Sequence, residues 1–455
     1  MSTAASELVA DLAAWTQELT GEPIRDIDRQ PGGGRHGAWA VRGENGGMWF
    51  LRADSAKPGP HEHYTLRRES EIYAAVASAG LPVPKVLGVH PVHEAVLMEY
   101  VPGNARFAPL DPGAQAAVVA DFAPLLARLH TADPAQMELP SLAPVMSITE
   151  HVGQELDIWG SRLNAVTAPN PFLRACFLWL QGNMPEVDGS PSLVQGDTGP
   201  GNFLHDGSRI TALLDFELAH LGDPIEDLAW VATRNAQDPV PDFDLFLAQY
   251  SAAGGVAFDG SRFRYHSLFA EVRIAVLGAE RAAAGGPSPM GDLGSGLIYG
   301  ALHQRLTLEA LCAAVGEPRP NLGSLPARDT GQTAYFDGVL RQMKDLIGPT
   351  IAEPFAAQRL KSLARVVKQL REVDRIGSEA LAEAELNDLE AVLGHRPPSS
   401  VEGRSELDAL VGAGEMDAVD LIPLATSDVS RAHQLAAGAM GSLATRHLPR
   451  PREIG

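Results

Sequence analysis

The stretch of residues 193–230 reads LVQGDTGPGNFLHDGSRITALLDFELAHLGDPIEDLAW, and the rest of the fold can be inferred outward from it. Within it, residues 202–205 and 209–214 have the composition of short strands and flank the turn-forming sequence Asp-Gly-Ser, which predicts a β-hairpin. Because the two ends of a hairpin meet, we expect Asp215 to lie beside Asn202. The stretch therefore gathers four side chains that carry oxygen atoms: Asp197, Asn202, Asp215 and Glu217.

The spacing from Asp197 to Asn202 is that of a kinase catalytic loop, in which four residues separate an Asp from an Asn. In that loop the Asp accepts the proton of the substrate hydroxyl and the Asn binds a magnesium ion. A second Asp one hairpin later suits the other metal contact, because Mg²⁺ prefers oxygen ligands. The spacing predicts Asp197 as catalytic base and Asn202 and Asp215 as magnesium ligands, with Glu217 as a further metal or substrate contact.

The segments QGDTGPGNFL and LLDFELAHLGDPIEDLAW together resemble the aminoglycoside phosphotransferase family, which has a protein-kinase-like fold. The resemblance is strong over residues 193–230, looser over residues 24–347, and nearest to the branch that is fused to acyl-CoA dehydrogenases. It implies ATP or GTP and Mg²⁺ as cofactors, and transfer of the γ-phosphoryl group to a hydroxyl of a small molecule. In the motif itself, Gln195 stands where the family usually has a His.

Two other interpretations compete with an enzyme. Asp and Asn residues in loops are often only turn formers, and Asp223 and Asp227 suit the cap of a helix that starts near Pro224. The second alternative is a catalytically silent nucleotide-binding pseudokinase that acts as a regulatory or interaction module, which the departures at Gln195 and Arg52 make conceivable. The register of all motif parts favours the enzyme.

Composition bounds the class of protein. The chain has 455 residues, 45% hydrophobic and 20% charged, which suits two or three globular domains. A formal net charge of -21 argues against nucleic acid and anionic membranes as partners. The start lacks a basic region and no apolar run reaches the roughly 18 residues of a membrane span, so we expect a cytoplasmic protein. The two cysteines, Cys176 and Cys312, are expected to be buried free thiols.

The first hundred residues predict a small nucleotide-binding lobe. An amphipathic helix is expected at residues 6–19. Three antiparallel strands are expected after it: residues 24–29, 38–42 and 48–53. Between the first two strands, three glycines allow backbone amides to approach ATP phosphates, although a plain turn is the competing interpretation: Gly32, Gly33 and Gly34.

Arg52 ends the third predicted strand, at the place where kinases carry the lysine that pairs with the nucleotide phosphates. An Arg keeps the positive charge but presents it as a planar fork. The resemblance implies that Glu69, on a helix expected at residues 67–79, pairs with Arg52, and Glu71 is the competing choice. Two further strands, residues 84–89 and 95–100, lead to a hinge. There, backbone groups near two residues would meet the adenine edge: Glu99 and Val101.

The rest of the chain is expected to be helical. Helices are predicted at residues 121–130, 171–181, 243–250, 265–283, 297–314 and 334–346. After Gly348 the composition shifts to Ala, Leu, Glu and Arg, and four more helices are predicted: residues 354–371, 378–393, 399–411 and 422–446.

The predicted fold is therefore α+β: a bilobal protein-kinase-like fold followed by a helical bundle. Residues 1–100 form the nucleotide-binding lobe, residues 101–347 the mainly helical catalytic lobe, and residues 348–455 the accessory domain. The accessory domain has no catalytic residues and is interpreted as a packing module or the interface of a homodimer. The acceptor, and the choice between ATP and GTP, stay open because fold does not determine substrate.

Overall fold

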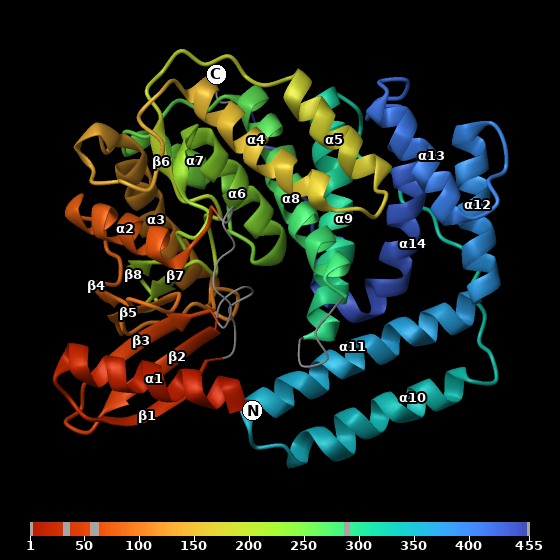
Figure 1. Cartoon of the computed structure of the whole chain (residues 1–455). Coiled ribbons are helices and arrows are strands. Elements are labelled where there is room, and N and C mark those ends of the chain that lie inside the picture. Colours follow the sequence, from red (N-terminus) through yellow and green to blue (C-terminus); the bar gives the residue numbers. More distant parts are fainter. Residues whose placement is uncertain (1–2, 31–36, 55–62, 286–291, 453–455) are drawn as a thin grey trace. The chain divides into compact units, whose positions relative to one another are not determined.

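The computed structural model describes residues 3–30, 37–54, 63–285 and 292–452 (Figure 1). These residues form two compact units: residues 1–151, 187–259 and 451–455 make up the first, and residues 152–186 and 260–450 the second. Residues 260–347 thus group with the C-terminal helices, so the boundary between the units does not coincide with the predicted domain boundary at Gly348.

The first unit contains a five-stranded antiparallel sheet in the order β1-β2-β3-β5-β4. The strands are β1 (Ile24–Arg29), β2 (Gly37–Gly43), β3 (Met48–Ala53), β4 (Val86–Val89) and β5 (Ala95–Glu99). The predicted antiparallel sheet is therefore confirmed. Strand β4 begins two residues later than predicted, after Pro84, which has no N–H to donate to a strand ladder.

Helix α1 (Thr3–Thr20) packs on one face of this sheet (Figure 1). Leu12 of α1 shares a buried cluster with Leu51 and Ala53 of β3 and with residues of the neighbouring strands. Side chains alternate between the two faces of a strand, so Arg52 points to the opposite face from Leu51 and Ala53. This alternation aims Arg52 at helix α2 (Leu66–Ser78), which starts after the N-cap Thr65.

The remainder of the first unit carries short strands between helices. Two small antiparallel pairs are present: β6 (Ser192–Val194) pairs with β9 (His220–Gly222), and between them in the chain β7 (Phe203–His205) and β8 (Ile210–Leu213) form a hairpin. The helices are α3 (Pro112–Thr131), α6 (Pro224–Gln237) and α7 (Phe243–Ala252). Helix α3 begins well before the predicted residue 121, because Asp111 caps it and Pro112 occupies its first turn.

The second unit is helical. It contains most of α4 (Ile148–Ala165) together with α5 (Pro171–Gly182), α8 (Gly260–Ala283), α9 (Leu293–Val315) and α10 (Thr333–Gln342). The predicted C-terminal helices are present as α11 (Pro354–Ile376), α12 (Ser378–Leu393), α13 (Ser400–Gly412) and α14 (Ile422–Met440). Helix α14 ends before the predicted residue 446 and continues as a 3-10 turn, Gly441–Thr445.

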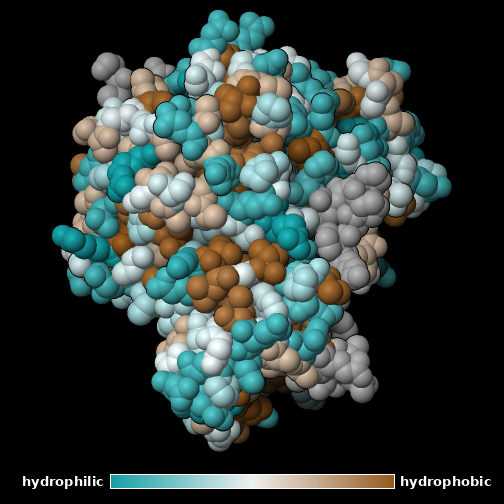
Figure 2. All heavy atoms as spheres, turned by 60° about the vertical axis from the view of Figure 1, so that its left-hand side comes forward, coloured by the Kyte–Doolittle hydropathy of each residue, from teal (hydrophilic) through white to brown (hydrophobic). Residues whose placement is uncertain are grey.

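Helix α9 joins the two halves of this unit. Leu308 and Cys312 of α9 form a buried cluster with Ala425 and Val429 of α14. Both cysteines are buried and free, as predicted. In the part of the chain that the structure describes, no helix is both long and apolar enough to cross a membrane. On the face drawn in Figure 2, hydrophobic residues lie interspersed among hydrophilic ones, as is usual for a folded protein surface.

Candidate active site

The predicted hairpin brings Asp215 to Asn202. Strands β7 and β8 pair, and just past them the N–H of Leu214 donates to the carbonyl of Asn202 at 2.9 Å. On its other side, Asn202 reaches back to Asp197: its Nδ2 donates to the Asp197 carbonyl at 2.7 Å and to Oδ2 of that side chain at 2.9 Å. Asn202 is buried, and with Nδ2 engaged in this way its Oδ1 remains as the acceptor.

Asp215 combines a strained backbone with an unsatisfied carboxylate. Its φ of 61° is the only positive value at a non-glycine residue in the described part of the chain. Such a conformation costs about 1–3 kcal/mol and clusters at functional sites. The N–H of Asp215 donates to the Tyr73 hydroxyl at 2.8 Å, which holds the strained residue in place. Its Oδ1 is buried and accepts no hydrogen bond from any described group.

Arg52 lies among three carboxylates. Its Nη1 is 2.5 Å from Oε1 of Glu69, and its Nη2 is 3.5 Å from both Oδ1 of Asp215 and Oε2 of Glu217. Three carboxylates around one guanidinium leave two negative charges in excess when all are ionised. That excess, together with the orphaned Oδ1 of Asp215, is the charge and donor set that fits a divalent cation.

Burial and charge perturb the acids of this cluster. Burial, followed by the charge of Asp215, raises the pKa of Glu69 to about 7, against the opposing effect of Arg52. Burial alone would lower the pKa of Arg52, but the surrounding carboxylates raise it above its ordinary value. Burial and the charge of Glu69 also raise the pKa of Tyr73 well above its usual range. Arg52 is therefore always positively charged, and three carboxylates interact with that one charge.

The structure distinguishes the two candidate partners of Arg52. Glu69 is 2% exposed and binds Arg52, whereas Glu71 accepts a hydrogen bond from Ser141. Arg68, the residue before Glu69, donates to the carbonyls of Glu217 and Ala219. Helix α2 thus holds both the cation of the site and the segment that follows Asp215.

Asp227 anchors the loop that carries Asp197. Its Oδ2 accepts from the N–H of Gln195 at 2.8 Å, and its Oδ1 from the N–H of Gly196 at 3.0 Å. His130 approaches the same Oδ2 at 3.0 Å through Nε2. The interpretation of Asp227 as only a helix cap is wrong, because Asp223 is the residue that caps α6.

The Gln195 side chain has taken a local structural role. Its Nε2 donates to the carbonyl of Leu214, next to Asp215. The loop and the end of the hairpin are therefore tied together by the residue that departs from the family motif. No sequence pattern indicates this bond, because its acceptor is a backbone carbonyl.

Asp197 is bound by a residue that the sequence did not single out. Nε of Arg234, from the last turn of α6, donates to Oδ1 of Asp197 at 2.8 Å, and Nη2 donates to Oδ2. Burial raises the pKa of Asp197, and the charge of Arg234 opposes that rise. The signal that could have found Arg234 is its position seven residues after Asp227, which puts both on one face of a helix.

The residues predicted to contact the nucleotide are placed only in part. Gly32, Gly33 and Gly34 lie outside the described residues. Glu99 ends β5, is exposed, and donates its N–H to the carbonyl of Lys85 at 2.8 Å. Val101 lies two residues further on and is half-buried. The adenine contacts of Glu99 and Val101 stay a prediction.

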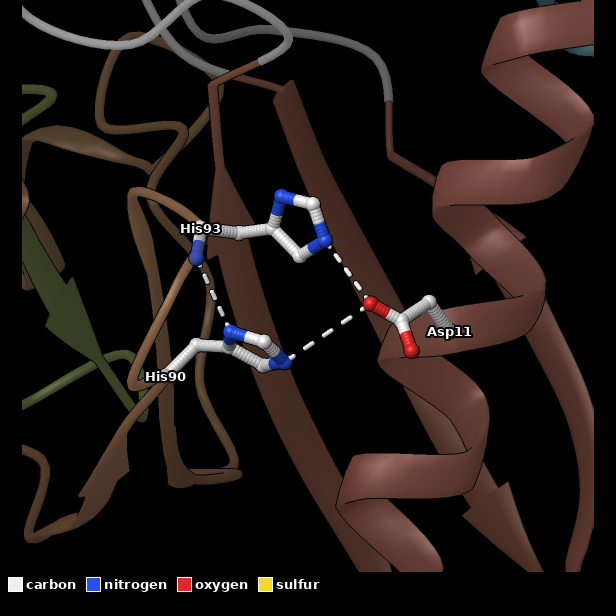
Figure 3. Close-up of side chains that lie close together, drawn as sticks. All are labelled: Asp11, His90 and His93. Atoms are coloured by element: carbon white, nitrogen blue, oxygen red, sulfur yellow. Dashed lines mark hydrogen bonds and ion pairs between the residues drawn. The ribbon is translucent and has the colours of Figure 1, made fainter.

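A second group of ligand-capable side chains lies at the sheet: Asp11 of α1, with His90 and His93 from the segment between β4 and β5 (Figure 3). Oδ2 of Asp11 is 2.7 Å from Nε2 of His93 and 3.9 Å from Nε2 of His90. Nδ1 of His90 accepts the backbone N–H groups of Val92 and His93 at 3.1 and 2.9 Å. In the neutral ring the proton must therefore sit on Nε2, which then has no lone pair for a metal. This geometry fits an anchor for helix α1 better than a metal centre.

The fold and the site together define the class of protein. It is a mixed α+β protein in which Asp197, Asn202 and Asp215 lie together in one buried acidic cluster. The family model described as "Phosphotransferase enzyme family" matches residues 28–266. That span exceeds half of the chain, so the chain belongs to the phosphotransferase enzyme family.

Curated relatives cover a smaller region. The mouse acyl-CoA dehydrogenase family member 10 is 28% identical over 179 residues, which is 37% of this chain and 16% of that protein. The human acyl-CoA dehydrogenase family member 11 is 26% identical over 191 residues, 38% of this chain and 23% of that protein. The resemblance to the fused branch is thereby confirmed. The chain spans about a fifth of the length of the curated relatives that it matches.

Solved structures of similar proteins include two phosphotransferases. A macrolide 2'-phosphotransferase from Brachybacterium faecium is 22% identical with a TM-score of 0.45, and the match covers 61% of this chain and 97% of that one. A thermostable mutant of the aminoglycoside phosphotransferase APH(4)-Ia, in complex with ADP and hygromycin B, is 19% identical with a TM-score of 0.43; coverage is 60% and 92%.

Proposed function

We propose that this chain is a magnesium-dependent small-molecule kinase that transfers the γ-phosphoryl group of ATP, or GTP, to a hydroxyl. The observation that carries the proposal is Asp215. Its strained backbone aims a buried oxygen without a hydrogen-bond donor at a cluster that has excess negative charge. Strain and an orphaned carboxylate both reduce stability, so both indicate a ligand that is bound during function.

The side chains divide the work. Oδ1 of Asn202 and the carboxylate of Asp215 would hold Mg²⁺, and Glu217, whose Oε2 lies 3.5 Å from the same Nη2 of Arg52 as Asp215, would assist them. When bound, the ion supplies charge that stabilises the transferring phosphoryl group. Asp197 accepts the proton of the acceptor hydroxyl, which makes the acceptor oxygen a better nucleophile.

Arg52 is the residue that would contact the nucleotide phosphates. Its pair with Glu69 fixes the direction of the guanidinium, and its permanent charge suits phosphate oxygens. The backbone around Gly32, Gly33 and Gly34 would cover the phosphates, and that of Glu99 and Val101 would bind the base. Cytosolic ATP and magnesium would supply such an enzyme, so we propose a cytoplasmic location.

The rival function is a silent nucleotide-binding module. Two variants separate it from an enzyme, because Asp197 and Asp215 act at different stages. Asp197→Asn should bind magnesium nucleotide like wild type while turnover falls by roughly 10²-fold or more. Asp215→Asn should lose magnesium-dependent nucleotide binding itself.

The assay pairs nucleotide titration with phosphate transfer to a panel of hydroxyl acceptors: aminoglycosides, macrolides, amino alcohols, sugars and hydroxyacyl thioesters. Nucleotide binding without turnover on any acceptor, and without an effect of Asp197→Asn, would favour the silent module. No magnesium-dependent nucleotide binding at millimolar concentration would refute both functions.

A further inference from the structure

Asp197 is held by two elements that lie far apart in sequence. Its Oδ1 accepts from Nε of Arg234, and its Oδ2 accepts from Nη2 of Arg234 and from Nδ2 of Asn202. A bidentate pair of this kind fixes the plane of the carboxylate as well as its position. The side chains of Asp197 and Arg234 are 21% and 19% exposed, so the pair is largely shielded from water.

The loop is shaped to admit this arginine. Residues 198–201, Thr-Gly-Pro-Gly, contain no cation of their own. A Cβ at Gly199 would lie 3.0 Å from Cβ of Arg234, and one at Gly201 would lie 3.3 Å from its Nη1. Both glycines also have positive φ values, 134° and 97°. The loop therefore leaves space at two points for a cation that arrives from another element.

Helix α6 contacts the loop twice. Asp227 accepts from the loop backbone at Gln195 and Gly196, and Arg234, two turns later on the same face, binds the Asp197 side chain. A single rigid helix thus sets both the path of the loop and the direction of its carboxylate.

One acceptor position remains on the carboxylate. An ionised Asp offers about four lone-pair positions, two on each oxygen. Oδ2 receives two hydrogen bonds and Oδ1 receives one from the described residues. The open position is on Oδ1, so this is the oxygen at which an acceptor hydroxyl would donate.

We propose that Arg234 is the positioning residue of the base: it orients the Asp197 carboxylate so that Oδ1 alone faces the acceptor hydroxyl. This inference rests on the proposed phosphotransfer. In that step the acceptor oxygen bonds to the γ-phosphorus. The bond between the γ-phosphorus and the bridging oxygen of the β-phosphate breaks, and the nucleoside diphosphate leaves with the electron pair. The acceptor proton passes to Oδ1 of Asp197 and is later released to water.

The test compares Arg234→Met, Arg234→Lys and the exposed control Arg209→Ala. With the best acceptor, Arg234→Met should reduce kcat by roughly 10²-fold. It should leave the KM for the acceptor nearly unchanged, because the orientation of the base acts on the chemical step, and it should leave binding of magnesium with a nonhydrolysable ATP analogue unchanged. Arg234→Lys keeps the charge but not the fork, so its kcat should fall as well. Arg209→Ala should match wild type in all three measurements.

One further measurement makes the outcome decisive. In an Asp197→Asn background, Arg234→Met should change kcat less than about 2-fold, because a positioning residue acts only through its base. A full additional loss, an unchanged kcat, or weakened nucleotide binding in Arg234→Met would overturn the inference.

The two proposals fail in different ways. No turnover of wild type with any acceptor would show that the phosphotransfer, and with it the role of Arg234, is wrong. Full kcat of Arg234→Met in an active enzyme would overturn the positioning role and leave the proposed function standing.

Discussion

Replacing Asp215 with Asn should stabilise the ligand-free protein and abolish its stabilisation by magnesium nucleotide. Asn adopts the left-handed conformation as readily as Asp, so the φ of 61° adds no new cost. The substitution removes one of three carboxylates that surround Arg52 and leaves Glu69 and Glu217 to balance its charge. It also removes a buried oxygen that lies 3.5 Å from Nη2 of Arg52 and accepts no hydrogen bond from the described residues.

The size of the effect follows from the neighbouring acid. The pKa of Glu69 rises from its ordinary 4.5 to about 7, first through burial and then, against Arg52, through the charge of Asp215. Removing the charge of Asp215 relieves its repulsion with Glu69, and it also removes a buried oxygen that has no hydrogen bond, a cost of about 1–3 kcal/mol. We expect a gain of about 1–2 kcal/mol. The melting temperature should then rise by roughly 2–4 °C for each kcal/mol.

With magnesium nucleotide bound, wild type should be more stable than Asp215→Asn. A nonhydrolysable ATP analogue with magnesium, at about 100 times its Kd, should stabilise wild type by about 2.7 kcal/mol and the variant hardly at all. Thermal melts with and without ligand measure both effects, and Asp188→Asn makes the same chemical change on an exposed loop as a control. A variant that is less stable than wild type without ligand, or that still responds to magnesium nucleotide, would refute this account of Asp215.

Three other outcomes are expected. Arg52→Ala and Glu69→Ala should each weaken nucleotide binding, and the double variant should lose less binding free energy than the sum of the two single variants. Additive losses in a nucleotide titration would show that the two residues are ordinary, uncoupled surface charges. The pKa of Glu69 is raised to about 7 in the folded protein. The free energy of unfolding of wild type, relative to that of Glu69→Gln, should therefore fall by up to about 3 kcal/mol as pH rises from 4.5 through 7. Denaturant titrations measure this, and a difference between the two proteins that does not change with pH would contradict it. Truncation after Ile347 should sharply lower soluble yield, because it uncovers Leu308 and its neighbours on α9; a folded, monomeric truncated protein would show that the C-terminal helices are dispensable.

The parts of the site that lie close together in the sequence could be predicted from it. Residues 193–230 contain the loop, the hairpin and both of their ends, so the proximity of Asp215 to Asn202 followed from a turn signal and strand alternation. The same reasoning located the strand that presents Arg52. It could not choose between Glu69 and Glu71, because both are acidic residues in one turn of α2 and only the direction of the helix decides.

Tertiary contacts account for what the sequence left out. Tyr73 could not be singled out from the sequence, because nothing in α2 reveals that its hydroxyl would meet the N–H of Asp215. Strands β6 and β9 have three residues each, too few for any periodicity to show. The start of helix α3 was missed because its cap, Asp111, precedes a Pro-Gly pair that resembles a turn in the sequence.

The departure from the family motif at Gln195 leaves the loop tied to the hairpin, because Gln195 donates to the carbonyl of Leu214, next to Asp215. Arg234 of α6 binds the side chain of Asp197 from outside the motif, and Gly199 and Gly201 leave the space for it. A substituted motif position therefore does not by itself imply lost activity, because the loop can be held by contacts of the substituted residue itself and of a neighbouring helix.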